Sequence, residues 1–313
     1  MLHLRAVCPV DVTDQVLAVL KRHGGATHIV LLRGAAIDPA GDVVEADVAR
    51  EAVDEVLAAL CALGVDRAGG LTLEQIDTAL SDAADRAQEV APGEGADAVV
   101  WEELLARTGE EARLNATFQS FLTIACLLAA VGVVTNSPVT IVGAMVVGPE
   151  FGPLAAIAVG LVLRRWDLVR RAALALAAGF PLAIAVTAVL ALVGSWFGLF
   201  DRTVLLSAHQ VDFVFQVGPF SLIVALLAGA AGMLSMTSAK SAALVGVFIS
   251  VTTVPAAGYV AIAAVLGEWD RAALSLGQLV VNLIGIVLAA ALVLAVRKRQ
   301  NLGTAAGRPL SNG

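Results

Sequence analysis

Charged side chains are scarce in this sequence of 313 residues. Asp, Glu, Lys and Arg make up 15% of it, whereas about a quarter is usual in soluble domains. Most of these charges precede residue 117, and long apolar runs fill the chain after it, which gives a mean hydropathy of +0.85. The asymmetry excludes a single soluble globule and predicts a soluble N-terminal part followed by a membrane part.

Several patterns that would carry chemistry are missing. The sequence has no His-Glu-x-x-His, Gly-x-Ser-x-Gly, P-loop or Rossmann glycine pattern, so we expect no enzyme activity and no cofactor. Its three cysteines, Cys8, Cys61 and Cys126, lack metal-ligand spacing, and we expect reduced, buried thiols and no metal. A net charge of −7 argues against nucleic-acid binding. Met1–Val10 has no long apolar core, so we expect no signal peptide.

The first 80 residues alternate between strand and helix patterns. Helices are predicted at 11–23, capped by Asp11 or Thr13, and at 49–63; strands are predicted at 2–7, 26–32, 43–48 and 71–76. The order βαββαβ is typical of a ferredoxin-like α+β domain, which we place at residues 1–80. Its histidines (His3, His23 and His28) also lack ligand spacing, and we expect them to be solvated or hydrogen-bonded.

Residues 81–117 are predicted to join this domain to the membrane. The stretch 81–97 contains Pro92, Gly93 and Gly95 and is typical of a flexible linker. Val99–Arg113 has the pattern of an amphipathic helix, which we expect at the membrane surface.

Six apolar segments are long enough, or nearly so, to cross a bilayer. They are 118–135, 139–163, 172–196, 219–237, 241–266 and 273–296. If the N-terminus is cytoplasmic, the connecting segments inside carry far more Arg and Lys than those outside, so both termini are expected in the cytoplasm. The membrane part then divides into 118–196, an external loop at 197–218, 219–296 and a cytoplasmic tail at 297–313.

An internal repeat is predicted from a shift of 103 residues. The shift places Val142-Gly143 on Val245-Gly246 and Trp166-Asp167 on Trp269-Asp270 without a gap. Each unit holds three spans, and because three is odd, the second unit enters the bilayer from the opposite side. We therefore predict an inverted 3+3 repeat, an arrangement shared by many secondary transporters.

The second and fifth spans are predicted to be broken near mid-membrane. The second contains Gly148, Pro149 and the acidic Glu150, and the fifth contains Thr252 and Thr253 within Val251–Gly258. Lipid tolerates broken backbone and an ionisable side chain only beside protein or a water-filled cavity. These residues are the predicted binding site for a small solute or ion.

Other polar residues are secondary candidates. Asn282 in the last span is added to the binding site, and Gln278 near the outer end of that span is a further candidate. The predicted gate or mouth residues are Asn136 and Ser137 on the outer side, and Ser238 and Lys240 on the inner side.

The run Asn136-Ser137-Pro138, Val142–Pro149 and Gly152-Pro153 resembles the hallmark of a prokaryotic membrane family. That family is catalogued as a domain of unknown function, number 389, and its members join a small N-terminal domain to hydrophobic spans. The resemblance implies a multi-pass protein of the prokaryotic cell membrane and brings no established reaction. This chain departs from it by carrying Glu150, where an apolar residue is expected.

Two functional classes follow from these features. The first is a secondary transporter or channel regulated by the N-terminal domain. The alternative is a membrane-anchored sensor or scaffold, which predicts a dry, closed core with no cavity reaching Glu150; an intramembrane enzyme lacks the motifs it needs. Small residues crowd the spans, so we also expect a homo-oligomer in the lipid bilayer.

Overall fold

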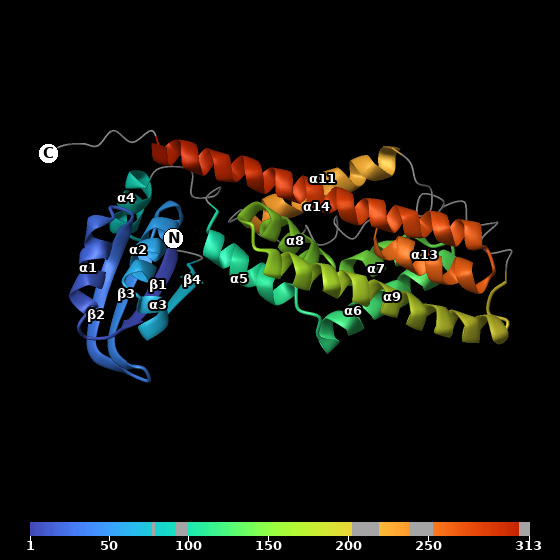
Figure 1. Ribbon diagram of the computed structural model, residues 1–313, viewed down its shortest axis with the longest axis horizontal. Coiled ribbons are helices and arrows are strands. Elements are labelled where there is room, and N and C mark those ends of the chain that lie inside the picture. The colour runs from blue at the N-terminus through green and yellow to red at the C-terminus, as the bar shows by residue number, and fades with distance from the viewer. Residues whose placement is uncertain (77–78, 92–98, 202–218, 238–252, 307–313) are drawn as a thin grey trace. The chain divides into compact units, whose positions relative to one another are not determined.

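The computed structural model describes residues 1–76, 79–91, 99–201, 219–237 and 253–306 (Figure 1). Contacts within the chain define two compact units, Met1–Leu104 and a second unit that begins at Leu105. The first contains a small sheet with helices, and the second is helical.

The sheet of the first unit is antiparallel, with strand order β2-β3-β1-β4. The element order is the predicted βαββαβ: β1 (Leu2–Cys8), α1 (Thr13–Arg22), β2 (Ala26–Ile37), β3 (Ala40–Val48), α2 (Val53–Ala62) and β4 (Gly70–Gln75). A short 3-10 turn, η1 (Arg50–Ala52), precedes α2, and α3 (Val65–Ala68) follows it.

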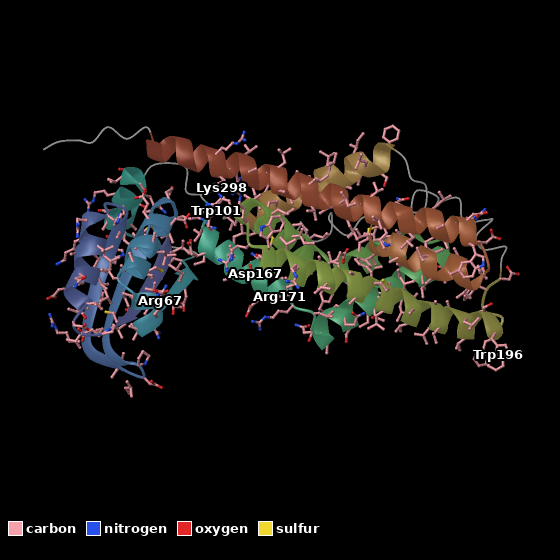
Figure 2. All side chains as sticks on the ribbon, viewed as in Figure 1. Arg67, Trp101, Asp167, Arg171, Trp196 and Lys298 are labelled. Atoms are coloured by element: carbon pink, nitrogen blue, oxygen red, sulfur yellow. The ribbon has the colours of Figure 1, made fainter. Side chains whose placement is uncertain are left out.

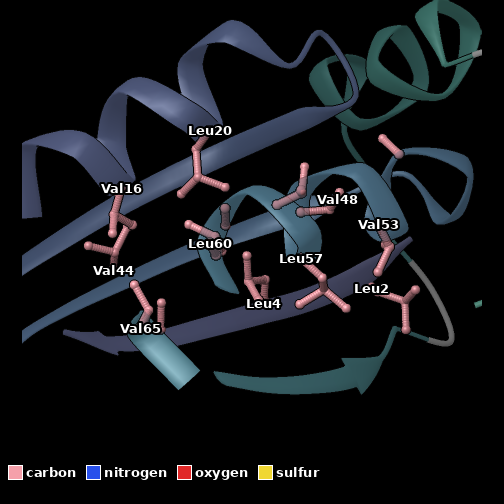
Figure 3. Close-up of a cluster of buried hydrophobic side chains, with 14 of the residues drawn as sticks. Leu2, Leu4, Val16, Leu20, Val44, Val48, Val53, Leu57, Leu60 and Val65 are labelled. Carbon is pink, nitrogen blue, oxygen red and sulfur yellow. The ribbon is translucent and has the colours of Figure 1, made fainter. Parts of the chain in front are cut away.

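One face of this sheet is buried beneath α1 and α2 (Figure 3). Strand β1 alternates between buried and accessible residues, with Leu2, Leu4, Ala6 and Cys8 inside, because successive side chains of a strand point to opposite faces. Leu20 and Leu60 meet this face from the two helices. The unit therefore has its own apolar core.

The predicted cap of α1 is wrong. Val12 occupies the capping position and makes no side-chain hydrogen bond to the helix. The Thr13 hydroxyl instead donates to the Asp42 carboxylate at 2.8 Å, which also accepts the Gly34 N–H at 2.7 Å. These hydrogen bonds, the one from Gly34 first, lower the pKa of Asp42.

The predicted flexible linker is partly wrong. Helix α4 (Asp82–Val90) occupies most of the described part of it, because the Ser81 hydroxyl caps the first turn by accepting the N–H groups of Ala83 and Ala84. Pro92, Gly93 and Gly95 lie outside the described residues. The predicted amphipathic helix is present as α5 (Trp101–Glu111).

Four described helices are long and apolar enough to cross a membrane. They belong to α6 (Ala116–Val134), α9 (Trp166–Trp196), α11 (Pro219–Thr237) and α14 (Trp269–Ala306). A fifth candidate is the bent pair α7 (Pro138–Val147) and α8 (Phe151–Leu163), and a shorter apolar helix, α13, covers Val254–Val265. The second unit thus fits a multi-pass membrane protein.

Tryptophans mark the ends of the long helices. Trp166 is the first residue of α9, Trp196 is its last, and Trp269 is the first of α14; each is at least 61% exposed. Figure 2 shows Trp196 at the end of α9. Amphipathic rings at helix ends are typical of membrane–water interfaces.

Candidate functional site

The second predicted span is broken, as the sequence indicates. Helices α7 and α8 meet at an angle of 54°. Pro149 has no N–H to continue α7 and disfavours helical backbone at the residue before it. Gly148 accordingly takes an extended conformation (φ −64°, ψ 126°) and ends the helix.

A new helix starts directly after the break. Glu150 occupies the capping position of α8, and its carbonyl accepts the Leu154 N–H at 3.2 Å. Pro153 falls in the first turn, where a missing N–H costs no helical hydrogen bond. The spacing of Pro149 and Pro153 therefore ends one helix and permits the next.

The Glu150 side chain is almost fully enclosed, with 1% of its surface exposed. Its Oε1 atom accepts a hydrogen bond from the Thr253 hydroxyl at 2.6 Å. Thr253 is fully buried and occupies the capping position of α13. The structure thus brings together two of the predicted binding residues at the first turns of α8 and α13, whose positive helix dipoles favour a negative charge.

The predicted break of the fifth span, within Val251–Gly258, is described only from Thr253 onward, where α13 begins. Helix α13 runs without interruption from Val254 to Val265, so Pro255 and Gly258 lie within it. Pro255 stands in the first turn, where proline is compatible with a helix. Thr252 and the preceding part of this span lie outside the described residues.

A cavity of about 400 Å³ reaches the break. Gly148, Pro149, Phe151 and Gly152 form one part of its lining. The rest consists of charged residues after Leu105, polar residues and apolar residues: Arg107, Glu110, Glu111, Arg113, Asn115, Thr117, Phe118, Phe121, Gly232, Ser235 and Met236. The volume suits a small molecule. The Glu150 side chain is buried and does not line the cavity.

Sequence reasoning missed the part of this cavity supplied by α5. That helix was expected only at the membrane surface, yet Arg107 and Glu111 line the cavity and form an ion pair at 3.2 Å. A Cβ atom added to Gly152 would lie 2.6 Å from the Glu111 Cβ. Gly152, two residues after Glu150, is the signal that could have indicated this close approach, because a glycine lets a neighbouring element come near the backbone.

Asn282 belongs to a second buried polar cluster. Its Oδ1 atom accepts a hydrogen bond from the Ser221 hydroxyl at 3.0 Å, and Gln278 donates to the same hydroxyl oxygen at 3.2 Å. Asn282 is 0% exposed and Gln278 is 2% exposed. Ser221 was not predicted, because a serine in an apolar helix often bonds only to its own backbone.

The two predicted mouth residues that the structure describes, Asn136 and Ser137, are not part of the cavity lining. Asn136 lies in the turn between α6 and α7 with φ +49°, and the Ser137 hydroxyl caps α7 by accepting the Thr140 N–H at 3.3 Å. Ser238 and Lys240 lie outside the described residues.

In the first unit, His3 and His28 share one carboxylate. Their Nδ1 atoms lie 2.9 and 2.7 Å from Asp47 oxygens, and His28 Nε2 lies 2.9 Å from the Ser81 hydroxyl. Burial acts to raise the pKa of Asp47, but these hydrogen bonds outweigh it and lower the pKa. Among the described residues, no group of three His, Cys, Asp or Glu side chains is placed to hold a metal ion.

The break thus offers three kinds of polar group. The last carbonyls of α7 lack helical partners, the Glu150 carboxylate accepts the Thr253 hydroxyl, and ionised side chains line the cavity. A carboxylate and carbonyl oxygens suit a cation or a proton, and paired Arg and Glu side chains suit a small polar solute.

The comparisons with known proteins identify the region around the break. Residues 145–288 match the family described as Domain of unknown function (DUF389). The resemblance seen in the sequence is therefore confirmed over these residues. Neither the curated proteins nor the solved structures give a significant match to the chain.

Proposed function

We propose that this chain, which carries the DUF389 region, is a secondary transporter or channel for a small solute or ion. One observation carries the proposal: a cavity ends at Gly148 and Pro149, beside a buried acid–hydroxyl pair at a helix break. Irregular backbone within apolar helices is found where it is buried in protein or lines a water-filled cavity. The sensor alternative predicts that no cavity reaches Glu150; the lining includes the residues on either side of Glu150 but not Glu150 itself, so flux decides between the two.

The helix boundaries support the inverted repeat. Helices α11, α13 and α14 each begin 103 residues after α6, α8 and α9, the shift predicted from the sequence. The Glu150–Thr253 hydrogen bond also joins residues 103 positions apart. In two units related by a two-fold axis, a residue meets its own counterpart only near the axis, so this bond would mark the axis.

The packing partners support the same symmetry. Helix α8 packs against α14, and its counterpart α13 packs against α9, the counterpart of α14. Such an exchange of partners is expected from two-fold related units. Under this proposal the chain has six spans and both termini lie on the cytoplasmic side; the first part of the fifth span, predicted at 241–266, lies outside the described residues.

Flux through reconstituted protein tests the proposal. We would place the full chain in liposomes and measure movement of H⁺, Na⁺, K⁺ and Cl⁻ down imposed gradients. We expect flux above that of empty liposomes, and a change of at least about tenfold in Glu150→Gln or Thr253→Val, because both alter the buried pair. Gly277→Ala is the matched control, since nothing lies within 4 Å of that added Cβ.

The outcome is decisive for the site. If flux by both variants equals that of the unmodified chain, Glu150 and Thr253 are removed from the pathway. If the unmodified chain moves none of the four ions, a panel of small polar solutes decides between a solute carrier and the scaffold alternative.

A further inference from the structure

A second groove lies between the start of α6 and α9. It has a volume of about 460 Å³ and is lined by Arg113, Leu114, Asn115, Arg171, Leu174 and Ala175. Arg113 and Asn115 come from the segment that joins α5 to α6, and Arg171 comes from the second turn of α9. The groove therefore brings together two guanidinium groups that lie far apart in the sequence.

The charge in this groove is positive. Its lining contains two arginines and no acidic residue. Among the described residues, neither Arg113 nor Arg171 forms an ion pair, and the nearby acid of α9, Asp167, is 3.6 Å from Arg165 instead. Figure 2 shows Arg171 and Asp167 near the start of α9. Two exposed guanidinium groups with an adjacent amide suit a phosphate group, which accepts paired hydrogen bonds from arginine.

The two leucines of the groove are exposed apolar residues. Leu114 is 51% exposed and Leu174 is 64% exposed. Leu174 lies three residues beyond Arg171 on α9, which is about 4.5 Å further along the helix. Beyond it, α9 continues as an apolar helix that is long enough to cross a membrane. A molecule whose phosphate is bound by the arginines would therefore have the rest of its structure over the leucines, in hydrocarbon and not in water.

We propose that this groove binds the headgroup of an anionic phospholipid. Arg113 and Arg171 bind the phosphate, Asn115 contacts the polar headgroup, and Leu114 and Leu174 contact the acyl chains. Basic pockets between membrane helices are suited to such headgroups. The exposed leucines favour a lipid over free phosphate, and this assignment does not depend on the transport proposal.

Lipid binding by the delipidated full chain tests the assignment. Native mass spectrometry would measure the apparent Kd for phosphatidylglycerol and for phosphatidylcholine in detergent, with and without 10 mM inorganic phosphate. We expect preferential binding of phosphatidylglycerol, weakened about tenfold or more in the Arg113→Gln/Arg171→Gln variant, because paired charged hydrogen bonds are lost. Arg113→Lys/Arg171→Lys should restore only part of the affinity, because lysine lacks the planar fork.

A matched variant separates local binding from overall charge. Arg33→Gln/Arg67→Gln removes the same two charges from the first unit and should leave the Kd unchanged. Equal binding of the two lipids, equal weakening by both Gln pairs, or full displacement by inorganic phosphate would each overturn the proposal. Circular dichroism of every variant establishes that a lost affinity is not lost folding.

Discussion

Asp54 is a carboxylate placed where a negative charge is unfavourable. Burial, together with a hydrogen bond and repulsion from Glu102, raises its pKa to about 7. Asp54 Oδ1 also accepts the Trp101 N–H at 3.2 Å, which ties the first turn of α5 to α2. In the unfolded chain the same group titrates near pH 3.9. The folded state thus binds more protons between about pH 4 and 7, so stability falls as pH rises through that window.

The Asp54→Asn variant should remove this pH dependence. An amide keeps the acceptor for Trp101 without carrying a charge, so at pH 8 the α2–α5 contact should be stabilised by roughly 1–2 kcal/mol, after allowance for partial solvation. Hydrogen exchange of residues 99–104 in the full chain should slow in the variant at pH 8 and match the unmodified chain at pH 4. If the variant and the unmodified chain exchange at the same rate at pH 8 as well as at pH 4, the expected protonation of Asp54 is contradicted.

The hydroxyl of Thr253 is expected to stabilise the buried Glu150. Thr253→Val keeps the shape but removes the donor, which should cost about 1–3 kcal/mol because a buried acceptor loses its bond. Thr253→Ser keeps the hydroxyl and should cost less. Thermal unfolding in detergent, followed by circular dichroism, compares the two; an equal melting temperature for all three proteins would show that the bond adds nothing.

At the scale of elements, Gly258 sets how closely α13 approaches α6. A Cβ atom there would lie 2.8 Å from the Ala129 Cβ and 2.9 Å from the Ala130 backbone nitrogen. Backbone cannot move aside as a flexible side chain does, so Gly258→Ala should destabilise the second unit by about 1–3 kcal/mol. Gly277→Ala, with no neighbour within 4 Å, should instead be neutral or stabilising by up to about 1 kcal/mol. Thermal unfolding measures both.

Element boundaries show which physical signals a sequence carries. The break at Gly148 and Pro149 was predictable because proline acts on the backbone locally. Alternation likewise predicted the strands, although β2 extends to Ile37. The start of α9 was missed by six residues, since Arg170 and Arg171 interrupt an apolar window without ending a helix.

Only part of the site could be predicted from the sequence. Glu150 was predicted because an acid in an apolar run is rare, and the repeat shift aligned it with Thr253. The cavity lining from Arg107 and Glu111 depends on a long-range approach of α5 to Gly152. Charged amphipathic patterns alone do not reveal which partner a helix contacts.

For the whole molecule, the inverted repeat makes a prediction about sidedness. In a cysteine-free background, Arg165→Cys and Glu268→Cys place thiols just before α9 and α14. If the units are inverted, a membrane-impermeant maleimide should label the first from the same side as the N-terminus and the second only from the opposite side. Labelling of both from one side would exclude the inverted arrangement.

Helix α14 has 38 residues and is therefore about 57 Å long, nearly twice the hydrocarbon thickness of a bilayer. Near its far end, the Lys298 ammonium donates to the Val162 carbonyl at the end of α8, at 3.3 Å. A helix of this length remains embedded when a bilayer thickens or thins, whereas α7 and α8 have only 10 and 13 residues on either side of their bend. We therefore expect lipid chain length to act on the angle between these two short helices, and so on the width of the opening beside them.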